Sequence, residues 1–307
     1  MDRELKYLII GAGGTGGAIG SHLVRAGKDV TFIARGKHLY TMVKQGLKVV
    51  KPSGDFIVTD FQASDMEHYS GDADVIFVCV KGYALEEIIP FLQKIAKRDT
   101  VVIPVLNIYG TGGEIQKKLS DSLVLDGCIY VAAEIKEPGV IFMNGDILRV
   151  IFGVRNKEDY RSVLNKIEND LNESGIKGIL SDNIKRDTMV KFSYISAQNA
   201  CGTYYNVAAG EIQKPGKIRD CFASLVHEIE ILGEAMNIKF EEDLVERNLR
   251  LIDSLSSNMT TSMQRDIRDG NKSEIKGLVY SVVNMAEHYG VDLPVFKKIT
   301  NELKKRE

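Results

Sequence analysis

A glycine-rich turn near the start of the chain limits its fold more than any other feature. The apolar run Tyr7-Leu8-Ile9-Ile10 predicts a short strand, and Gly11-Ala12-Gly13-Gly14-Thr15-Gly16 and a helical stretch follow it. In this G-x-G-x-x-G spacing the first glycine permits a tight turn, the second lets the backbone approach a pyrophosphate, and the third lets the helix pack closely on the strand. The start of the helix also supplies amide donors for phosphates. The sequence therefore predicts a dinucleotide site with contacts from Gly11, Ala12, Gly13, Gly14, Thr15 and Gly16.

The residue after the second predicted strand indicates which dinucleotide binds. That strand covers residues 29–34, and Arg35 follows it near the expected position of the adenosine ribose. An NAD-specific site has Asp or Glu there to hold a free 2′-hydroxyl, whereas a guanidinium suits a 2′-phosphate. We therefore predict NADP(H) as the cofactor, with Arg35 as a ligand of its phosphate. The alternative for Arg35 is a solvated loop residue.

The composition is typical of a cytoplasmic enzyme that uses no metal. With 307 residues, 44% of them hydrophobic, the chain is long enough for about two domains. Its net charge of −2 gives no electrostatic reason to expect a nucleic-acid partner, and no run approaches the roughly 20 apolar residues that span a membrane. The four cysteines lack a C-x-x-C spacing and the five histidines are scattered, so we expect free thiols in a reducing compartment and no zinc site.

Alternating strand-like and helical runs predict the fold class. They continue to about residue 182 and favour an α/β, Rossmann-type doubly wound sheet with an antiparallel extension. Residues 47–50 and 56–58 are expected to form a hairpin. From residue 183 onward, helical periods fill 184–205, 215–237, 241–256 and 273–289. We therefore predict an NADP(H)-binding domain at residues 1–182 and an all-helical substrate and catalytic domain at residues 183–307.

Polar residues stand at the predicted carboxyl ends of two sheet strands, where ligands bind in such folds. Lys81 follows the strand that ends at Val80, and Asn107 follows the apolar run that ends at Leu106. These positions make both residues candidates for ligand contact. A surface lysine and a turn or cap residue are the alternatives.

The helical half also carries candidate residues. Lys191 and Asn199 are eight positions apart, so they share one helical face with Ile195 between them. Farther on, Ser273 is expected to cap a helix and to place Glu274 in its first turn, where the helix dipole favours an anion. A solvated lysine and a purely structural glutamate are the alternatives.

Taken together, these motifs resemble those of the ketopantoate reductases (2-dehydropantoate 2-reductases). The resemblance covers nearly the whole chain and implies a Rossmann domain followed by a helical domain similar to that of 6-phosphogluconate dehydrogenase. It also implies NADPH-dependent reduction of a 2-keto acid, with ketopantoate reduced to pantoate in pantothenate and coenzyme A biosynthesis. The matching elements are the glycine turn, Arg35, Val80-Lys81, Asn107, Glu137-Pro138-Gly139, the Lys191 helix with Asn199, and the segment 261–268 leading to Ser273-Glu274-Ile275.

The same resemblance implies roles for the candidate residues. Lys191 would be the general acid, and Glu274 its polar partner beside the reacting carbonyl. A positioned lysine suits this reduction because its ammonium can stabilise the developing alkoxide and then protonate it. The other implied contacts are Ser262 with the substrate carboxylate, Asn107 and Asn199 with the substrate, and Lys81 and Asn107 with the cofactor.

Two positions on the implied substrate side depart from the family pattern. Ile195 stands where the family usually has an asparagine, and Ile108 where it commonly has the glycine of an Asn-Gly pair. An alkyl group cannot replace an amide hydrogen bond. Ketopantoate is the leading substrate, and a related hydroxy-acid dehydrogenase of altered specificity and a non-catalytic NADP(H)-binding sensor are the alternatives. A homodimer is compatible with the sequence, which does not determine the oligomeric state.

Overall fold

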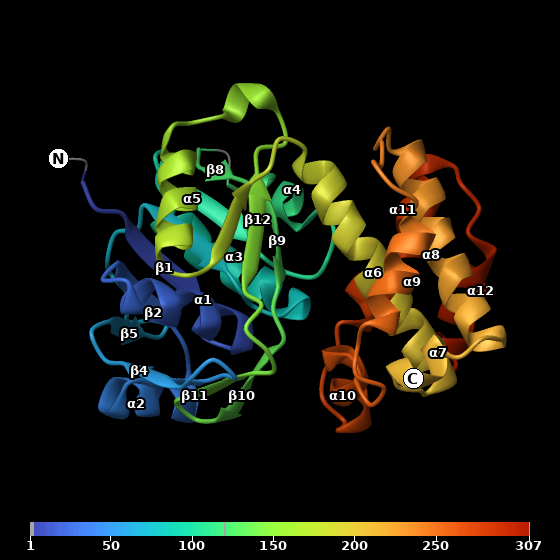
Figure 1. Ribbon diagram of the computed structural model, residues 1–307. Coiled ribbons are helices and arrows are strands. Elements are labelled where there is room, and N and C mark those ends of the chain that lie inside the picture. Colours follow the sequence, from blue (N-terminus) through green and yellow to red (C-terminus); the bar gives the residue numbers. More distant parts are fainter. Residues whose placement is uncertain (1–2, 120, 307) are drawn as a thin grey trace. The chain divides into compact units, whose positions relative to one another are not determined.

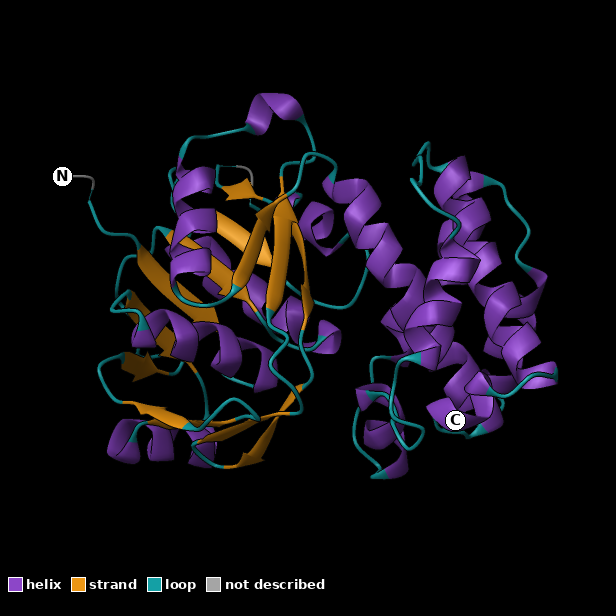
Figure 2. Cartoon of the chain, viewed as in Figure 1, coloured by secondary structure: helices purple, strands orange, loops and turns teal. Residues whose placement is uncertain are grey.

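The chain folds into two compact units, and one short segment belongs to the second unit although the chain before and after it belongs to the first. The computed structural model describes residues 3–119 and 121–306. The first unit runs through Leu106 and resumes over Gly110–Ile184, whereas the second contains Asn107–Tyr109 and the chain from Lys185 onward. In the described chain the strands belong to the first unit and helices build the second (Figure 2). Residues 107–109, which begin two residues beyond the end of β7 (Val101–Pro104), therefore pack with helices that lie much later in the sequence.

The first unit alternates strands with helices (Figure 1). Its strands are β1 Lys6–Ile10, β2 Asp29–Ile33, β3 Leu47–Val50, β4 Phe56–Val58, β5 Gln62–Ser64, β6 Val75–Val78, β7 Val101–Pro104, β8 Leu123–Val124, β9 Asp126–Tyr130, β10 Ala133–Glu137, β11 Val140–Met143, β12 Arg149–Gly153 and β13 Lys177–Leu180. Its helices are α1 Gly14–Arg25, α2 Gly36–Gln45, α3 Leu85–Ile95, α4 Thr111–Gln116 and α5 Val163–Glu173, with short 3₁₀ turns at Gly82–Ala84 and Lys157–Asp159.

The main sheet confirms the predicted Rossmann-type order. Its strands run β5-β2-β1-β6-β7-β8, and every pairing between them is parallel. The side chains of β1 alternate between two hydrophobic cores: Tyr7 and Ile9 pack in one, and Leu8 and Ile10 pack in the other. Burial on both faces explains the nearly continuous apolar strands of this sheet. Strand β5 was not predicted, because its residues, Gln62-Ala63-Ser64, include no apolar run.

The predicted antiparallel extension of the main sheet was wrong. In the described chain the antiparallel pairs lie in two further sheets, β10-β11-β3-β4 and β13-β12-β9. The predicted hairpin is confirmed as β3 and β4, but it joins β11 rather than the main sheet. Helix α1 packs on β10 and β11 as well as on β2, so the sheet of the hairpin covers a second side of this helix. The helix therefore uses two apolar faces, each contacting strands.

The second unit is helical throughout its described part. Its elements are α6 Ile184–Tyr205, which begins on the last residue of the first unit, α7 Ala209–Gln213, α8 Lys217–Ala235, α9 Leu244–Asp253, α10 Ser262–Arg268, a π-helical turn Lys276–Tyr280, α11 Ser281–Tyr289 and α12 Pro294–Lys304. The bounds of α6 agree with the predicted 184–205. Helix α12 was missed, although Pro294 at its first turn is a common helix-start signal.

The predicted cap at Ser273 was also wrong. The carbonyl of Glu274 accepts the first two hydrogen bonds of the following turn, from the amides of Gly277 at 3.0 Å and Leu278 at 2.9 Å. The π-helical turn begins only after Ile275, and no side chain caps it. Glu274 therefore stands at the start of the helix rather than inside its first turn.

The buried carboxylate of Asp170 connects three segments of the first unit. Asp170 on α5 accepts a hydrogen bond of 2.6 Å from the Tyr7 hydroxyl on β1 and one of 2.7 Å from the ammonium of Lys28. Asp170 is only 7% exposed. Burial and the bond to Asp170 raise the pKa of the Tyr7 hydroxyl, which keeps it protonated as a donor.

Replacing this carboxylate is expected to destabilise the first unit. Asp170→Ala leaves the Lys28 ammonium and the Tyr7 hydroxyl without their buried acceptor, which lowers the free energy of unfolding by about 2–4 kcal/mol. Glu173 also bonds Lys28, but its side chain is 66% exposed, so Glu173→Ala is the matched control with a loss below about 1 kcal/mol. Urea denaturation of both variants tests the difference. Equal losses would show that burial of the Asp170 contact contributes nothing.

Candidate active site

The glycines of the turn after β1 are required by contacts on several sides. Gly11 has φ +94°, a conformation that side chains disfavour. A Cβ on Gly14 would lie 2.2 Å from the carbonyl oxygen of Ala133, and one on Gly16 would lie 2.1 Å from the carbonyl oxygen of Gly11. By contrast, no atom of the described chain lies within 4 Å of a Cβ built on Gly13. The turn is therefore packed where it meets the protein and open at its second motif glycine.

This geometry fits a dinucleotide pyrophosphate. Gly13 is the N-cap of α1, and no side chain caps the first helical turn. The amides of Gly11 and Ala12 bond the carbonyl oxygen of Ile33 at 3.0 and 3.3 Å, which holds the turn against the end of β2. The helix start therefore faces the open side with backbone donors that favour an anion.

Arg35 follows β2, as the sequence predicted, and directly precedes α2, a helix that the sequence did not predict. It is the N-cap of that helix, its backbone is extended, and its side chain is exposed. The guanidinium makes no hydrogen bond or ion pair with the described part of the chain. Lys37, in the first turn of the same helix, is also exposed. Two cations and no carboxylate thus follow β2, a charge pattern that suits a 2′-phosphate.

Sequence reasoning missed one residue that contacts the glycine turn. Nε2 of His38 lies 2.9 Å from the carbonyl oxygen of Ala12, and its Nδ1 lies 3.1 Å from the amide nitrogen of Gly139. The contacts join residues 26 and 101 positions apart, so no local pattern could have revealed them. Gly139 belongs to the Glu137-Pro138-Gly139 turn between β10 and β11, whose role the sequence left open.

Lys81 lies after the end of β6 in the first unit. It is partly buried, and its carbonyl oxygen accepts a 2.9 Å hydrogen bond from the amide of Ala84 in the following 3₁₀ turn. Its position after a parallel strand is the predicted one. A ligand contact for this lysine stays a prediction.

Asn107 and Lys191 meet within the second unit. The Nζ atom of Lys191 donates a 2.6 Å hydrogen bond to Oδ1 of Asn107, although 84 positions separate the two residues. Lys191 is 5% exposed, which rules out the alternative of a solvated lysine. Tyr109, two residues after Asn107, packs its ring against Phe192 with centroids 6.0 Å apart. The segment after β7 is therefore fixed to helix α6 at two neighbouring points.

Ile195 and Asn199 continue the Lys191 side of α6. Nδ2 of Asn199 donates a 2.7 Å hydrogen bond to the carbonyl oxygen of Ile195. Oδ1 of Asn199 is buried and has no hydrogen-bond partner among the described residues. A buried acceptor without a donor is costly, so this atom suits a donor from a bound molecule. Ile195 itself is partly buried against the helical core.

Glu274 and Ser262, which are predicted to contact the substrate, also belong to the second unit. Glu274 is 5% exposed and precedes the π-helical turn. Ser262 is the first residue of α10, whose cap is Thr261 in a reciprocal capping box with Gln264. Contacts of Glu274 or Ser262 with a substrate stay predictions.

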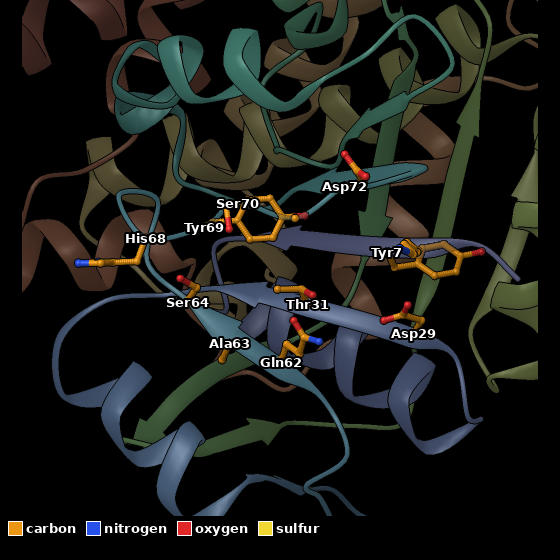
Figure 3. A pocket seen from close by; sticks show the side chains of 12 residues that line it. Tyr7, Asp29, Thr31, Gln62, Ala63, Ser64, His68, Tyr69, Ser70 and Asp72 are labelled. Carbon is orange, nitrogen blue, oxygen red and sulfur yellow. The ribbon is translucent and has the colours of Figure 1, made fainter.

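A separate polar groove lies in the first unit. It has a volume of about 420 Å³, and Asp29 and Thr31 of β2, Gln62 and Ser64 of β5 and Tyr69 line part of it (Figure 3). None of the predicted cofactor residues lines this groove. Within the described residues, no helix is long and apolar enough to cross a membrane, and no group of three His, Cys, Asp or Glu side chains could hold a metal.

Family models match nearly the whole chain. The model described as ketopantoate reductase PanE/ApbA matches residues 7–157, and the model of its C-terminal part matches residues 183–307. These two matches cover the glycine turn, Arg35, Asn107 and every candidate residue of the helical unit.

Individual relatives are distant but equally complete. The chain is 28% identical to the uncharacterised oxidoreductase YkpB of Bacillus subtilis over 96% of each chain. It is 25% identical to 2-dehydropantoate 2-reductase of Pyrococcus horikoshii over 95% of this chain and 94% of the relative. A D-mandelate dehydrogenase solved with NADH and anilino(oxo)acetate has the same fold, with a TM-score of 0.86, 21% identity and coverage of 97% and 96% of the two chains.

Removing the Arg35 guanidinium is expected to weaken binding of NADPH selectively. Arg35→Ala loses a charge-assisted contact to the 2′-phosphate, which costs about 1.5–3 kcal/mol, and leaves NADH affinity unchanged. Lys44→Ala, at the last turn of the same helix, is the control. Calorimetric titration with both dinucleotides measures the effect. Equal affinity of the unmodified protein for NADH and NADPH would contradict the assignment.

Proposed function

Because this chain belongs to the ketopantoate reductase PanE/ApbA family, we propose that it reduces a 2-keto acid with NADPH and that Lys191 donates the proton. Members of this family are oxidoreductases that use NADPH. One observation carries the proposal: the buried 2.6 Å contact between the Lys191 ammonium and Asn107. A binding protein without turnover has no need to bury an ammonium beside a polar amide, since burial of a charge is costly.

Lys191 has the surroundings that a positioned acid needs. Asn107 accepts one hydrogen bond of its ammonium and thereby fixes the direction of the other N–H groups. When bound, NADPH supplies the hydride for the carbonyl carbon. The ammonium then stabilises the negative charge on the carbonyl oxygen and transfers a proton to it. Low exposure limits competition from water for the same N–H groups.

We assign the remaining roles by their chemistry and by the family resemblance. The first unit, within residues 1–182, holds the cofactor through the glycine turn, Arg35 and Lys81. The second, within residues 183–307 and joined by Asn107, holds the substrate. The unpartnered Oδ1 of Asn199 supports a contact with a substrate hydroxyl, and the Ser262 hydroxyl is assigned to the substrate carboxylate. Buried Glu274 is assigned to the carbonyl end of the substrate.

Ketopantoate is the substrate that we propose first, because it is the substrate of the family. Two apolar residues favour a second candidate, a 2-keto acid without a hydroxyl on its side chain. Ile195 lies one turn from Lys191, and Ile108 follows Asn107 directly. Ile108 packs so closely on Gly277 that a Cβ there would lie 2.3 Å from its Cδ1 atom. Both isoleucines are partly buried against the helical core and offer alkyl surface beside the Lys191–Asn107 contact.

Loss of the Lys191 ammonium is expected to abolish most turnover without preventing cofactor binding. Lys191→Ala lowers kcat by roughly 10²-fold or more, the usual scale for losing a general acid, and leaves the Kd for NADPH nearly unchanged. Lys185→Ala, an exposed lysine on the same helix, is the control. Consumption of NADPH with a panel of 2-keto acids provides the assay. A folded Lys191→Ala variant with normal turnover would refute the assignment, and a native protein inactive on the whole panel would favour a sensor.

Ile195 is expected to set the preference between hydroxylated and unhydroxylated substrates. An amide in its place gives the ketopantoate hydroxyl a second partner besides Asn199, so Ile195→Asn raises kcat/KM for ketopantoate relative to trimethylpyruvate by about 5- to 150-fold, equivalent to about 1–3 kcal/mol. Val190→Asn alters a partly buried residue on another face of the same helix and leaves the ratio unchanged. Steady-state kinetics with both substrates give the ratio. An unaltered ratio in folded Ile195→Asn would mean that Ile195 faces only the helical core.

A further inference from the structure

His38 links two backbone segments that are distant in the sequence. Its side chain starts from helix α2 and reaches the carbonyl oxygen of Ala12 with Nε2, at 2.9 Å, and the amide of Gly139 with Nδ1, at 3.1 Å. Both contacts lie within the first unit. The histidine is partly buried, and its ring therefore exchanges contacts with water for contacts with backbone groups.

The two partners determine the state of the ring. A backbone amide can only donate, so Nδ1 must carry a lone pair and accept the bond from Gly139. The carbonyl oxygen of Ala12 can only accept, so the single ring proton is on Nε2. Burial lowers the pKa of His38, which favours this neutral form. Neutral His38 thus satisfies a donor and an acceptor at once.

The Gly139 contact explains the Glu137-Pro138-Gly139 turn. Gly139 has φ +79°, and a Cβ there would lie 2.6 Å from Cγ2 of Thr41, also on α2. Its carbonyl oxygen accepts a 2.9 Å hydrogen bond from the amide of Lys48. The turn is therefore held against α2 by His38 and Thr41 and against β3 by Lys48, with no room for a side chain.

The Ala12 contact joins the same helix to the glycine turn. Arg35 is the N-cap of α2, three residues before His38. A dinucleotide that contacts both the glycine turn and Arg35 requires a fixed separation between them. Among the described residues, His38 provides a side-chain bridge of this kind from α2 to Ala12, and its ring also contacts Gly139.

We propose that His38 is a positioning residue for NADP(H), holding Arg35 and the glycine turn at the separation that the dinucleotide requires. The inference rests on the proposed cofactor. His38 touches neither the phosphates nor the reacting atoms; it acts through the backbone of Ala12 and the helix that begins at Arg35. Without the bridge, the bonds of Gly11 and Ala12 to Ile33 still hold the turn against the end of β2, but the start of α2 loses its own link to the turn, and affinity falls by the cost of ordering it when the dinucleotide binds.

Two replacements of His38 distinguish the effect of its two hydrogen bonds from the effect of the imidazole ring itself. The amide of His38→Gln can accept from Gly139 through oxygen and donate to Ala12 through nitrogen, whereas His38→Leu fills the space and makes neither bond. Fluorescence titration with NADPH is expected to give a Kd about tenfold higher for His38→Leu and within about threefold of the unmodified protein for His38→Gln. At saturating NADPH, kcat of both variants stays unchanged while KM for NADPH follows Kd.

A fragment of the cofactor provides the second measurement. Adenosine 2′-monophosphate carries the 2′-phosphate assigned to Arg35 but lacks the pyrophosphate assigned to the glycine turn. Its Kd is therefore expected to be unchanged by His38→Leu, while the Kd of NADPH rises. Should His38→Leu be unfolded by circular dichroism, His38→Ser replaces it in both titrations. His68→Leu is the matched control, since His68 is an exposed histidine of the same unit that pairs with Asp65.

The outcomes distinguish this inference from the proposed function. If the unmodified protein does not bind NADPH, the proposed cofactor is wrong. If it binds NADPH and His38→Leu binds equally well, or if the NADPH and adenosine 2′-monophosphate affinities fall together, the positioning role is overturned. Weak binding by His38→Gln equal to that of His38→Leu would also overturn it, because the two bridging bonds would then not be the cause.

Discussion

The buried ammonium of Lys191 needs a hydrogen-bond acceptor, and Asn107 provides it. Asn107 belongs to a short segment that follows a strand of the first unit in the sequence but packs with the helices of the second unit. This segment, Asn107–Tyr109, joins the second unit, held by the Lys191 hydrogen bond, the ring contact with Phe192 and the packing of Ile108 on Gly277. The segment begins two residues beyond the end of β7, so the part of the chain that forms a strand of the first unit also supplies the hydrogen-bond acceptor for the Lys191 ammonium.

The parts of the molecule that sequence predicted are those whose cause is local. The glycine turn follows from the G-x-G-x-x-G spacing between one strand and one helix, and the bounds of α6 match the helical stretch predicted at 184–205. Strand β5 lacked an apolar run, so only its pairing with β2 makes it a strand. His38 and Gly277 acquire their importance from partners 101 and 169 positions away, Gly139 and Ile108. No periodicity or spacing within a short window carries such information. Residue identity indicated that Lys191 and Asn107 were candidates, but their mutual contact required the fold.

The two departures from the family pattern have different physical meanings. Ile195 offers an alkyl side chain instead of an amide near Asn199, whose Oδ1 is buried without a partner in the described chain. Ile108 adds bulk beside Asn107, and the absence of a side chain at Gly277 accommodates that bulk. The first change therefore alters which polar groups a bound molecule can satisfy, whereas the second alters the shape available to it. Neither departure lies in the glycine turn or at Arg35, the positions proposed to hold the cofactor.

The packing of Ile108 on Gly277 also restricts the order in which this protein can change during evolution. A Cβ at position 277 would lie 2.3 Å from Cδ1 of Ile108, so even alanine there requires the Ile108 side chain to shift. A smaller residue at position 108 removes this conflict before position 277 changes, whereas the reverse order forces the shift. The two positions are therefore expected to be coupled: among homologues, a large residue at 108 should be found mostly with glycine at 277. This pair of residues is therefore a marker by which sequences that share the Ile108–Gly277 packing can be recognised.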